Sequence, residues 1–281
     1  MNTIRIIPRL DIKGPNLVKG IHLEGLRVLG SPANFAEFYY QQGADELFYQ
    51  DVVASLYERN GLTEIISKTA KKAFIPLTVG GGIRTIEDIN GMLRAGADKV
   101  AINTAAIKNP KLIKEASRKF GSSTIVIAIE AIKQADGTYL AYTDNGREHT
   151  GIDASVWARR AEELGAGEVI ITSIDKEGTG EGFDLELIEA ISTSVDIPVI
   201  AHGGMGQLID ATSAVNAKAN ALAISSVLHY GYIEKNRSTE NTTEEGNINF
   251  LRSGNKFSKI SNMNIGEIKD YLISNDVDCR K

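Results

Sequence analysis

The sequence predicts a single (β/α)8 barrel, and the first observation behind this prediction is the alternation of its elements. Eight short, mostly apolar runs alternate with amphipathic, helix-like stretches. Strands that are apolar on both faces and are separated by crossover helices are typical of a parallel sheet covered on both sides. Eight such units imply a closed barrel. In chain order, the predicted strands are RIIPRL, ELFYQ, PLTVG, KVAIN, TIVIAI, EVIITS, PVIAH and ALAIS.

The second observation is an internal repeat with an offset of 122 residues. IPLTVGGGI at 75–83 corresponds to IPVIAHGGM at 197–205, so that Gly81 matches Gly203. Two further pairs of segments share the same offset, one around the fourth and eighth strands and one around the second and sixth. We infer that two four-stranded half-barrels form the whole, with residues at equal depth facing each other.

The composition is that of an ordinary globular protein and excludes several classes. A single cysteine, Cys279, allows neither an intrachain disulfide nor a thiolate metal cluster and fits a reducing compartment. The net charge of −5 argues against a general nucleic-acid footprint. Neither a secretory signal nor a run of about 18 apolar residues is found. We therefore expect a cytoplasmic protein that binds neither nucleic acid nor membrane.

One segment interrupts the alternation of strands and helices. Residues 233–264 are rich in Asn, Ser, Thr, Glu and Lys, and helical periodicity returns only with IGEIKDYLISNDV. We interpret residues 1–281 as one barrel domain in which 233–264 is a probable flexible insertion before the last helix. A solvated loop is the interpretation we favour, and a functional lid is the alternative.

Two acidic residues stand at the ends of predicted strands. Asp11 ends the first strand and Glu130 ends the fifth, 119 residues later and close to the repeat offset. Catalytic groups of such barrels lie at the carboxyl ends of the strands. We expect the two carboxylates to face one cavity, where partial burial separates their pKa values for acid and base roles. The alternative is that each acid caps a helix or pairs with a nearby lysine such as Lys19.

Two glycine-rich turns occupy matching positions in the two halves. VGGGI follows the third strand and HGGMG follows the seventh, which leaves backbone N–H groups open near helix N-termini and favours anion binding. Hydroxyl or amide side chains follow one strand later in each half. The pattern predicts two phosphate sites, and hence a substrate with a phosphate at each end. These polar residues are Asn103 and Thr104 in the first half and Ser225 and Ser226 in the second.

Charged residues also begin several strands and point to the opposite face of the barrel. Charges on that face are usually exposed and structural, but a ring of alternating sign could gate the bottom of the barrel. The four histidines lack the spacing of metal ligands, and no nucleophile elbow is found, so we expect neither metal nor cofactor. The ring consists of Arg5, Glu46, Lys99 and Glu168.

Several segments closely resemble the cyclase subunit of imidazole glycerol phosphate synthase, over about residues 4–232 and 264–280. They include RIIPRLDIK, VGGGIRTIED, AGADKVAINTAA and GAGEVIITSIDKEGT. The resemblance implies a heterodimer in which a glutaminase subunit docks on the N-terminal barrel face and its ammonia passes through the barrel. The ammonia would react with a bis-phosphorylated substrate, phosphoribulosyl formimino aminoimidazole carboxamide ribotide. The products would be imidazole glycerol phosphate and aminoimidazole carboxamide ribotide, as part of histidine biosynthesis.

The resemblance also implies roles for single residues. Asp11 and Glu130 would be the catalytic acid–base pair, Lys19 would lie on a flexible first loop over the substrate, and Asp98 would contact the glutaminase. The ring of four charges would be the ammonia gate. One phosphate would be held by Gly82, Asn103 and Thr104, and the other by Gly178, Gly204, Ser225 and Ser226.

The chain departs from the family at the substrate mouth. Glu130 and Glu177 replace aspartates, and an extra methylene moves a carboxylate by about 1 Å, which can cost roughly 10²-fold in rate. Arg9 replaces a small interior residue, commonly Cys, and needs buried partners, for which Glu130 is a candidate. His202 replaces a small Ser-like residue and either reaches the ligand or packs.

These departures leave two other functions open. One is a divergent paralogue that delivers glutaminase-derived ammonia to another acceptor, as in surface-sugar amidination. The other is a non-catalytic scaffold that activates a glutaminase.

Overall fold

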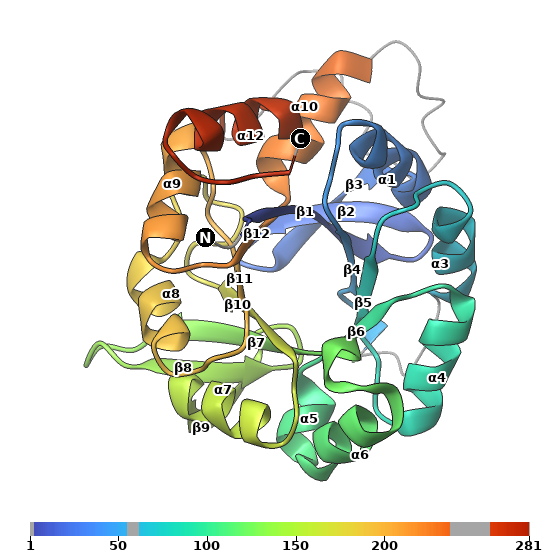
Figure 1. The fold of residues 1–281 in the computed structure, drawn as a ribbon, viewed down its shortest axis with the longest axis vertical. Helices are drawn as coiled ribbons and strands as arrows, with labels where there is room; N and C mark the ends of the chain where they lie inside the picture. Colours follow the sequence, from blue (N-terminus) through green and yellow to red (C-terminus); the bar gives the residue numbers. More distant parts are fainter. Residues whose placement is uncertain (1–2, 55–61, 237–258, 281) are drawn as a thin grey trace.

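The structure is a computed structural model and describes residues 3–54, 62–236 and 259–280. Eight parallel strands form a closed barrel that is surrounded by helices, which confirms the predicted fold class (Figure 1). The strands follow one another around the barrel in chain order, and pairing of β12 with β1 closes it. The barrel strands are β1 (Arg5–Lys13), β4 (Leu47–Asp51), β5 (Leu77–Gly80), β6 (Lys99–Ile102), β7 (Ile125–Lys133), β10 (Glu168–Ser173), β11 (Val199–His202) and β12 (Ala221–Ile224).

The helices bury their apolar faces against the outside of the barrel. α4 shows how their ends are encoded, because Thr85 and Asp88 form a capping box at its start and Gly96, with φ 118°, ends it. Trp157 of α7 is buried, as its helix pattern predicts. The helices are α1 (Pro32–Gln41), α3 (Thr63–Ala70), α4 (Ile86–Ala95), α5 (Thr104–Lys108), α6 (Lys111–Phe120), η1 (Ser122–Thr124, a 3-10 helix), α7 (Ala154–Glu163), α8 (Leu185–Ser192), α9 (Leu208–Asn216), α10 (Ser226–Asn236) and α12 (Ile265–Ser274).

A layer of apolar side chains fills the middle of the barrel. Alternate residues of a barrel strand point inward, and every barrel strand except β5 contributes one or two residues to this layer. The layer lies between the charged residues that begin the strands and the polar residues that end them. Its members are Ile7, Phe48, Ala101, Val126, Ala128, Ile170, Ile200, Ala221 and Ala223.

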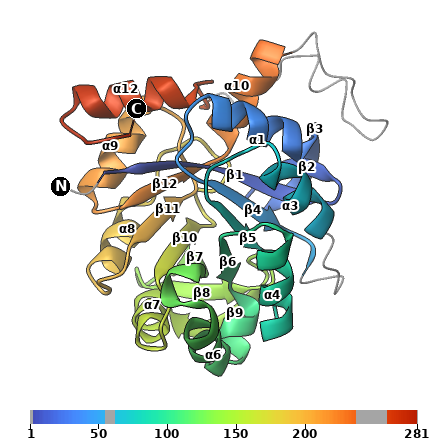
Figure 2. The same ribbon diagram turned by 45° about the vertical axis from the view of Figure 1, so that its right-hand side comes forward.

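The 122-residue repeat is visible in the structure as pairs of matching elements, such as β6 with β12 and α4 with α9. Each half also carries an antiparallel hairpin after its first strand, which the sequence did not predict. The β2–β3 hairpin pairs with an extension of β1, and the β8–β9 hairpin pairs with an extension of β7. Figure 2 shows β1 running from the N-terminus to the β2–β3 hairpin. These strands are β2 (Asn16–Ile21), β3 (Glu24–Gly30), β8 (Tyr139–Thr143) and β9 (Glu148–Asp153).

The structure describes both ends of the segment predicted as an insertion, 233–264. α10 continues to Asn236, so the first residues of the predicted insertion are helical. Residues 237–258 lie outside the described residues. After them, the backbone N–H of Ser261 donates to Gly206 O at 3.0 Å, and that of Met263 donates to Val227 O at 3.3 Å, before α12 begins. This end of the segment is therefore held against α10 and the loop after β11.

The same Phe→Ala change at Phe48 and at Phe74 tests whether the apolar layer is tightly packed. Phe48 is fully buried inside the barrel, whereas Phe74 is 74% exposed. We expect Phe48→Ala to lower the free energy of unfolding by about 3–5 kcal/mol, because it leaves a cavity in the barrel. Phe74→Ala should change it by about 0.5 kcal/mol or less. Urea denaturation of both variants checks this, and equal losses would contradict a packed interior.

Candidate active site

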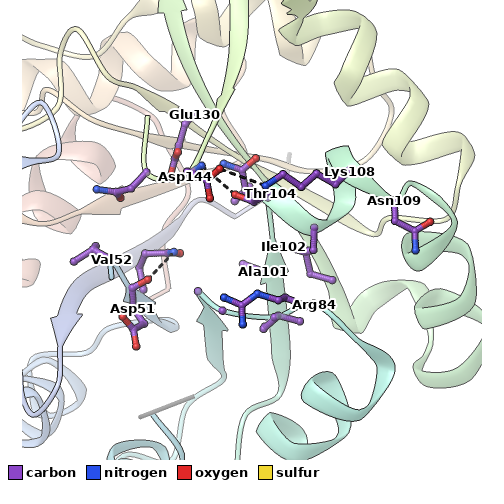
Figure 3. Close-up of a pocket in the computed structure, with 18 residues that line it drawn as sticks. Asp51, Val52, Arg84, Ala101, Ile102, Thr104, Lys108, Asn109, Glu130 and Asp144 are labelled. Atoms are coloured by element: carbon purple, nitrogen blue, oxygen red, sulfur yellow. Dashed lines mark hydrogen bonds and ion pairs between the residues drawn. The ribbon is translucent and has the colours of Figure 1, made fainter. Parts of the chain in front are cut away.

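A cavity of about 380 Å³ opens at the carboxyl ends of β4, β5, β6 and β7 (Figure 3). It lies in the first half of the barrel, and the turn between β8 and β9 forms one of its walls. Both predicted groups of that half, the glycine turn and Glu130, contribute to its lining. The polar and glycine residues of the lining include Asp51, Gly82, Arg84, Asn103, Thr104, Lys108, Glu130, Asp144 and Asn145.

The residues of the first predicted phosphate site, Gly82, Asn103 and Thr104, line part of this cavity. Gly81 and Gly82 have φ values of 97° and 71°, and a Cβ on Gly81 would lie 2.3 Å from a carbonyl oxygen of β4, so this turn requires glycine. The side-chain Nδ2 of Asn103 donates to Tyr142 O at 3.1 Å, and Thr104 Oγ1 accepts from Asp144 N at 3.0 Å. Both side chains are therefore oriented by the β8–β9 hairpin, while the cavity keeps an open glycine turn.

Glu130 is a buried carboxylate at the edge of the cavity. It lies within β7 rather than at its end, because β7 extends beyond the barrel and pairs Glu130 with Tyr142 of β8. Its Oε2 has no hydrogen-bond partner among the described residues. Burial raises the pKa of Glu130 to about 7, although the charge of Arg9 and the Gly146 N–H act to lower it. A carboxyl group of this kind can hold or release a proton near neutral pH.

The charge of Asp11 acts to raise the pKa of Glu130, but Asp11 is not among the residues that line the cavity. Its Oδ1 accepts from Arg9 Nε at 3.1 Å, and its Oδ2 lies 3.6 Å from Lys19 Nζ. Burial acts to raise the pKa of Asp11, but the two cations outweigh it and hold the pKa below its usual value. The two predicted catalytic acids therefore have pKa values displaced in opposite directions.

Lys19 lies in a strand and not in a loop, which corrects that part of the expectation. It belongs to β2, is buried, and donates to Glu177 Oε1. The turn after β2 is held by the same glutamate, since Leu23 N donates to Glu177 Oε2 at 3.1 Å and His22 N donates to Glu177 O at 3.0 Å. The tip of this hairpin also meets the β8–β9 tip, where Asn145 Nδ2 donates to Leu23 O at 3.3 Å.

The β2–β3 hairpin packs against one residue of the second predicted phosphate site, Gly178. A Cβ on Gly178 would lie 2.6 Å from Gly20 O, and one on Gly204 would lie 2.1 Å from Gly182 O. Ser225 and the neighbouring Ser226 are both buried. The glycines here allow close approach of backbone segments, and in this structure those segments occupy the space beside them.

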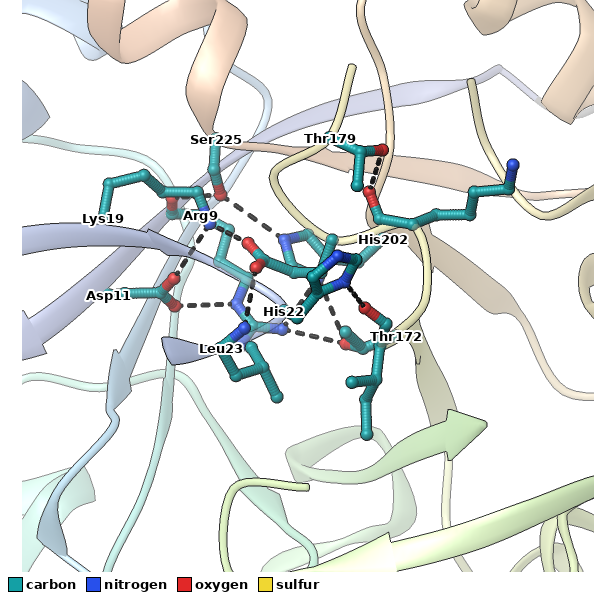
Figure 4. Close-up of polar contacts among 12 residues, drawn as sticks. Arg9, Asp11, Lys19, His22, Leu23, Thr172, Thr179, His202 and Ser225 are labelled. Carbon is teal, nitrogen blue, oxygen red and sulfur yellow. Dashed lines mark hydrogen bonds and ion pairs between the residues drawn. The ribbon is translucent and has the colours of Figure 1, made fainter. Parts of the chain in front are cut away.

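Arg9 crosses the barrel interior below the mouth (Figure 4). We expected Glu130 as its partner, but the described contacts of the guanidinium are with Asp11, Thr172 and His202. His202 is buried, and its Nδ1 lies 3.1 Å from Arg9 Nη1. These acceptors come from β1, β10 and β11, so Arg9 ties three barrel strands together.

The four charges at the N-terminal face form a closed cycle. Arg5 Nη1 donates to Glu46 Oε2 at 2.9 Å, and Arg5 Nη2 donates to Glu168. Lys99 Nζ lies 3.0 Å from each of the same two glutamates. On the same face Asp98 is exposed, while its Oδ2 accepts from Leu77 N at 2.8 Å. The roles of the ring as a gate and of Asp98 as a partner contact stay predictions.

The sequence reasoning missed four charged residues that line the cavity. Asp51 ends the second strand as Asp11 ends the first, so the same argument could have found it. Asp144 and Asn145 stand in TDNG, a strong turn signal between two strands that would have located the β8–β9 hairpin. Arg84 and Lys108 follow the glycine turn and the fourth strand within a few residues, and both bring positive charge to the cavity.

Two other features of the described chain bear on function. Within residues 3–54, 62–236 and 259–280, no three His, Cys, Asp or Glu side chains gather as a metal site. In the same ranges, none of the helices combines the length and apolarity needed to cross a membrane.

The closed barrel, with its glycine turn and buried carboxylates at the carboxyl ends of the strands, defines an enzyme of the (β/α)8 class. The chain belongs to the histidine biosynthesis protein family, whose model matches residues 5–234.

The relatives indicate a more particular kind of protein within this family. Similar proteins from three bacteria are each named imidazole glycerol phosphate synthase subunit HisF. The chain is 61% identical over 208 residues to the Legionella pneumophila protein, an alignment that covers 74% of this chain and 98% of the relative. It is 46% identical over 235 residues to the protein of Bifidobacterium adolescentis, covering 82% and 92%. It is also 46% identical over 228 residues to that of Streptomyces griseus, covering 81% and 91%.

The raised pKa of Glu130 predicts a pH-dependent stability. Between pH 4.5 and about 7, Glu130 keeps its proton in the folded protein but loses it in the unfolded chain. Raising the pH through this range therefore favours unfolding at this site. As the pH rises from 4.5 to about 7, the stability of Glu130→Gln relative to the wild type should increase by about 1–3 kcal/mol. Above this range the difference should stay constant. Urea denaturation across this range measures the difference, and a difference independent of pH would contradict the shift.

Proposed function

We propose that the chain is the cyclase subunit of an imidazole glycerol phosphate synthase and uses ammonia to convert phosphoribulosyl formimino aminoimidazole carboxamide ribotide. The observation that carries this proposal is the cavity at the barrel mouth, where a buried carboxyl group adjoins a glycine turn. The cavity offers backbone N–H groups and the Arg84 and Lys108 cations for a phosphate. The names of its relatives support this choice of substrate.

Asp11 and Glu130 divide the proton transfers between them. Ammonia that adds to the ketone carbon of the ribulosyl group must lose a proton from nitrogen, and the carbonyl oxygen must gain one. Glu130, with a pKa of about 7, can deliver a proton near neutral pH. Asp11 has a lowered pKa and stays ionised, so it can accept one. The opposite displacement of the two pKa values supports Glu130 as the acid and Asp11 as the base.

The second phosphate would bind where the β2–β3 hairpin now lies. Gly178 is in contact with Gly20 of this hairpin, and Lys19 is committed to Asp11 and Glu177. Substrate binding would therefore move the hairpin away from Gly178 and free Lys19 for the ligand. The first phosphate, by contrast, would bind at the glycine turn of the open cavity without such a movement.

Ammonia would enter from the opposite face. A glutaminase subunit docked near exposed Asp98 would release ammonia at the ring of Arg5, Glu46, Lys99 and Glu168. The neutral molecule would then cross the apolar layer and pass Arg9 to reach Glu130. Family membership favours this histidine-pathway reaction over delivery to another acceptor, and buried catalytic carboxyls favour it over a non-catalytic scaffold.

Replacing either acid tests the reaction itself. With an ammonium salt as nitrogen source, Asp11→Asn and Glu130→Gln should each lower kcat by about 10²-fold or more, because general acid or base catalysis is lost. Glu64→Gln is the matched control, since the Glu64 side chain is 78% exposed and does not line the cavity. Formation of imidazole glycerol phosphate is the measurement. A wild-type protein that activates a glutaminase but does not turn this substrate over would overturn the proposal.

The ring allows a separate test of the ammonia route. Lys99 contacts both ring glutamates, so Lys99→Met should disturb the ring and reduce glutamine-dependent turnover by the complex roughly tenfold or more. Turnover with external ammonium should change little, because that ammonia can reach the cavity from the mouth. Equal loss of both activities would contradict a gate and indicate a structural role for the ring.

A further inference from the structure

Arg9 is a buried cation in the centre of the barrel that the proposed reaction does not by itself require. Its Nε donates to Asp11 Oδ1 at 3.1 Å, and its Nη1 donates to Thr172 Oγ1 at 3.0 Å. The same Nη1 lies 3.1 Å from His202 Nδ1, and the guanidinium carbon lies 5.7 Å from the centre of the Phe48 ring. Three polar contacts thus hold the guanidinium (Figure 4), and it also lies over the Phe48 ring.

The contact with Arg9 determines the state of His202. A guanidinium can only donate, so Nδ1 of His202 must accept, and the ring proton then lies on Nε2, 3.4 Å from Ser225 Oγ. Burial and the neighbouring Arg9 charge lower the pKa of His202 well below its usual value. His202 is therefore a neutral imidazole, and its acceptor atom Nδ1 lies 3.1 Å from both Arg9 Nη1 and Thr172 Oγ1.

The guanidinium also connects the two carboxylates of the proposed reaction. Arg9 holds Asp11 directly, and the residue that it contacts on β10, Thr172, is the register partner of Glu130 on β7. Its charge acts on both acids. Arg9 thus lies between the proposed base and the proposed acid, below the atoms that would meet the substrate.

We propose, on the basis of the proposed function, that Arg9 is a positioning residue that holds Asp11 in place for the cyclase reaction. In this proposal, His202 is the matched acceptor of Arg9 and not a substrate ligand. The planar guanidinium can donate to Asp11 through Nε and to Thr172 and His202 through Nη1, a geometry that a lysine cannot reproduce. Positions 9 and 202 would then act as one pair.

The proposal predicts the direction of a change in pH dependence. Removing the Arg9 cation should raise the pKa of Asp11 and of Glu130, so both limbs of the pH profile should move to higher pH. The other charged or titratable groups that act on these two acids stay unchanged in the variants. They are Lys19 of β2, Asp144 of the β8–β9 turn and His229 of α10, with Glu177 bound to Lys19.

The first experiment compares Arg9→Met with Arg9→Lys. Substrate turnover is measured with ammonium across the pH range, at a constant concentration of free ammonia. Arg9→Met should lower kcat about 10- to 100-fold, change KM less than about threefold, and move both limbs to higher pH. Arg9→Lys keeps the charge and should leave the limbs near their wild-type positions with a smaller loss of kcat. Unmoved limbs in Arg9→Met, or an effect on KM alone, would overturn the proposal.

The second experiment tests the pairing with His202. His202→Asn places an amide oxygen near the position of Nδ1, whereas His202→Leu removes the acceptor. Loss of kcat should be larger in His202→Leu than in His202→Asn. Adding His202→Leu to Arg9→Met should cost little more than Arg9→Met alone, because both changes remove one interaction. Additive losses, or a rise in KM dominating both His202 variants, would indicate that His202 acts on the substrate.

A third measurement separates this inference from the proposed function. Carboxyl 13C NMR titrations of Asp11 and Glu130, without substrate, should show both pKa values rising in Arg9→Met but not in Arg9→Lys. A wild-type protein without ammonium-dependent turnover would refute the proposed function. A wild-type protein that turns over, together with an Arg9→Met variant whose carboxyl titrations match it, would refute the role of Arg9 alone.

Discussion

The arrangement of the barrel mouth depends on a chain of four buried charges. Arg9, Asp11, Lys19 and Glu177 alternate in sign, and each contacts the next with almost no exposure to solvent. An isolated charge at such depth would cost several kcal/mol, so each member needs its neighbours. The position of Asp11, the docking of the β2–β3 hairpin and the state of the second phosphate region all follow from this neutral chain.

Glu130 stands apart from this chain, and the contrast gives the site its chemistry. It has no direct cationic partner at hydrogen-bond distance among the described contacts, and one of its oxygens is unpaired. Burial therefore dominates its titration, whereas neighbouring cations dominate that of Asp11. The surroundings thus shift the pKa values of two carboxyl groups in one barrel mouth in opposite directions, although the side chains differ by only one methylene.

The fold could be predicted from the sequence because its signals are local or repeated. Apolar runs such as that of β7 and the 122-residue offset identify the strands and their order. The site was predicted only in part. Glu130 and Thr104 lie on the cavity as expected, since the ends of parallel strands gather at one face. The partners of Arg9 could not be predicted, because Thr172 and His202 are 163 and 193 residues away and come from other strands. The hairpins were missed because strands such as NLVKGI and YLAYT are short and lie beyond the eight-unit pattern, although TDNG marks the turn of one of them.

Leu23 lies in the turn of the β2–β3 hairpin. It adopts a left-handed conformation, with φ 62°, which costs a side chain other than glycine roughly 1–2 kcal/mol. His22 shares this conformation, with φ 51°, so the cost belongs to the turn of the hairpin itself, and the bonds to Glu177 offset part of it. The strained turn is thus stabilised by the same glutamate that binds Lys19, and Glu177 supports both the turn and the buried charges.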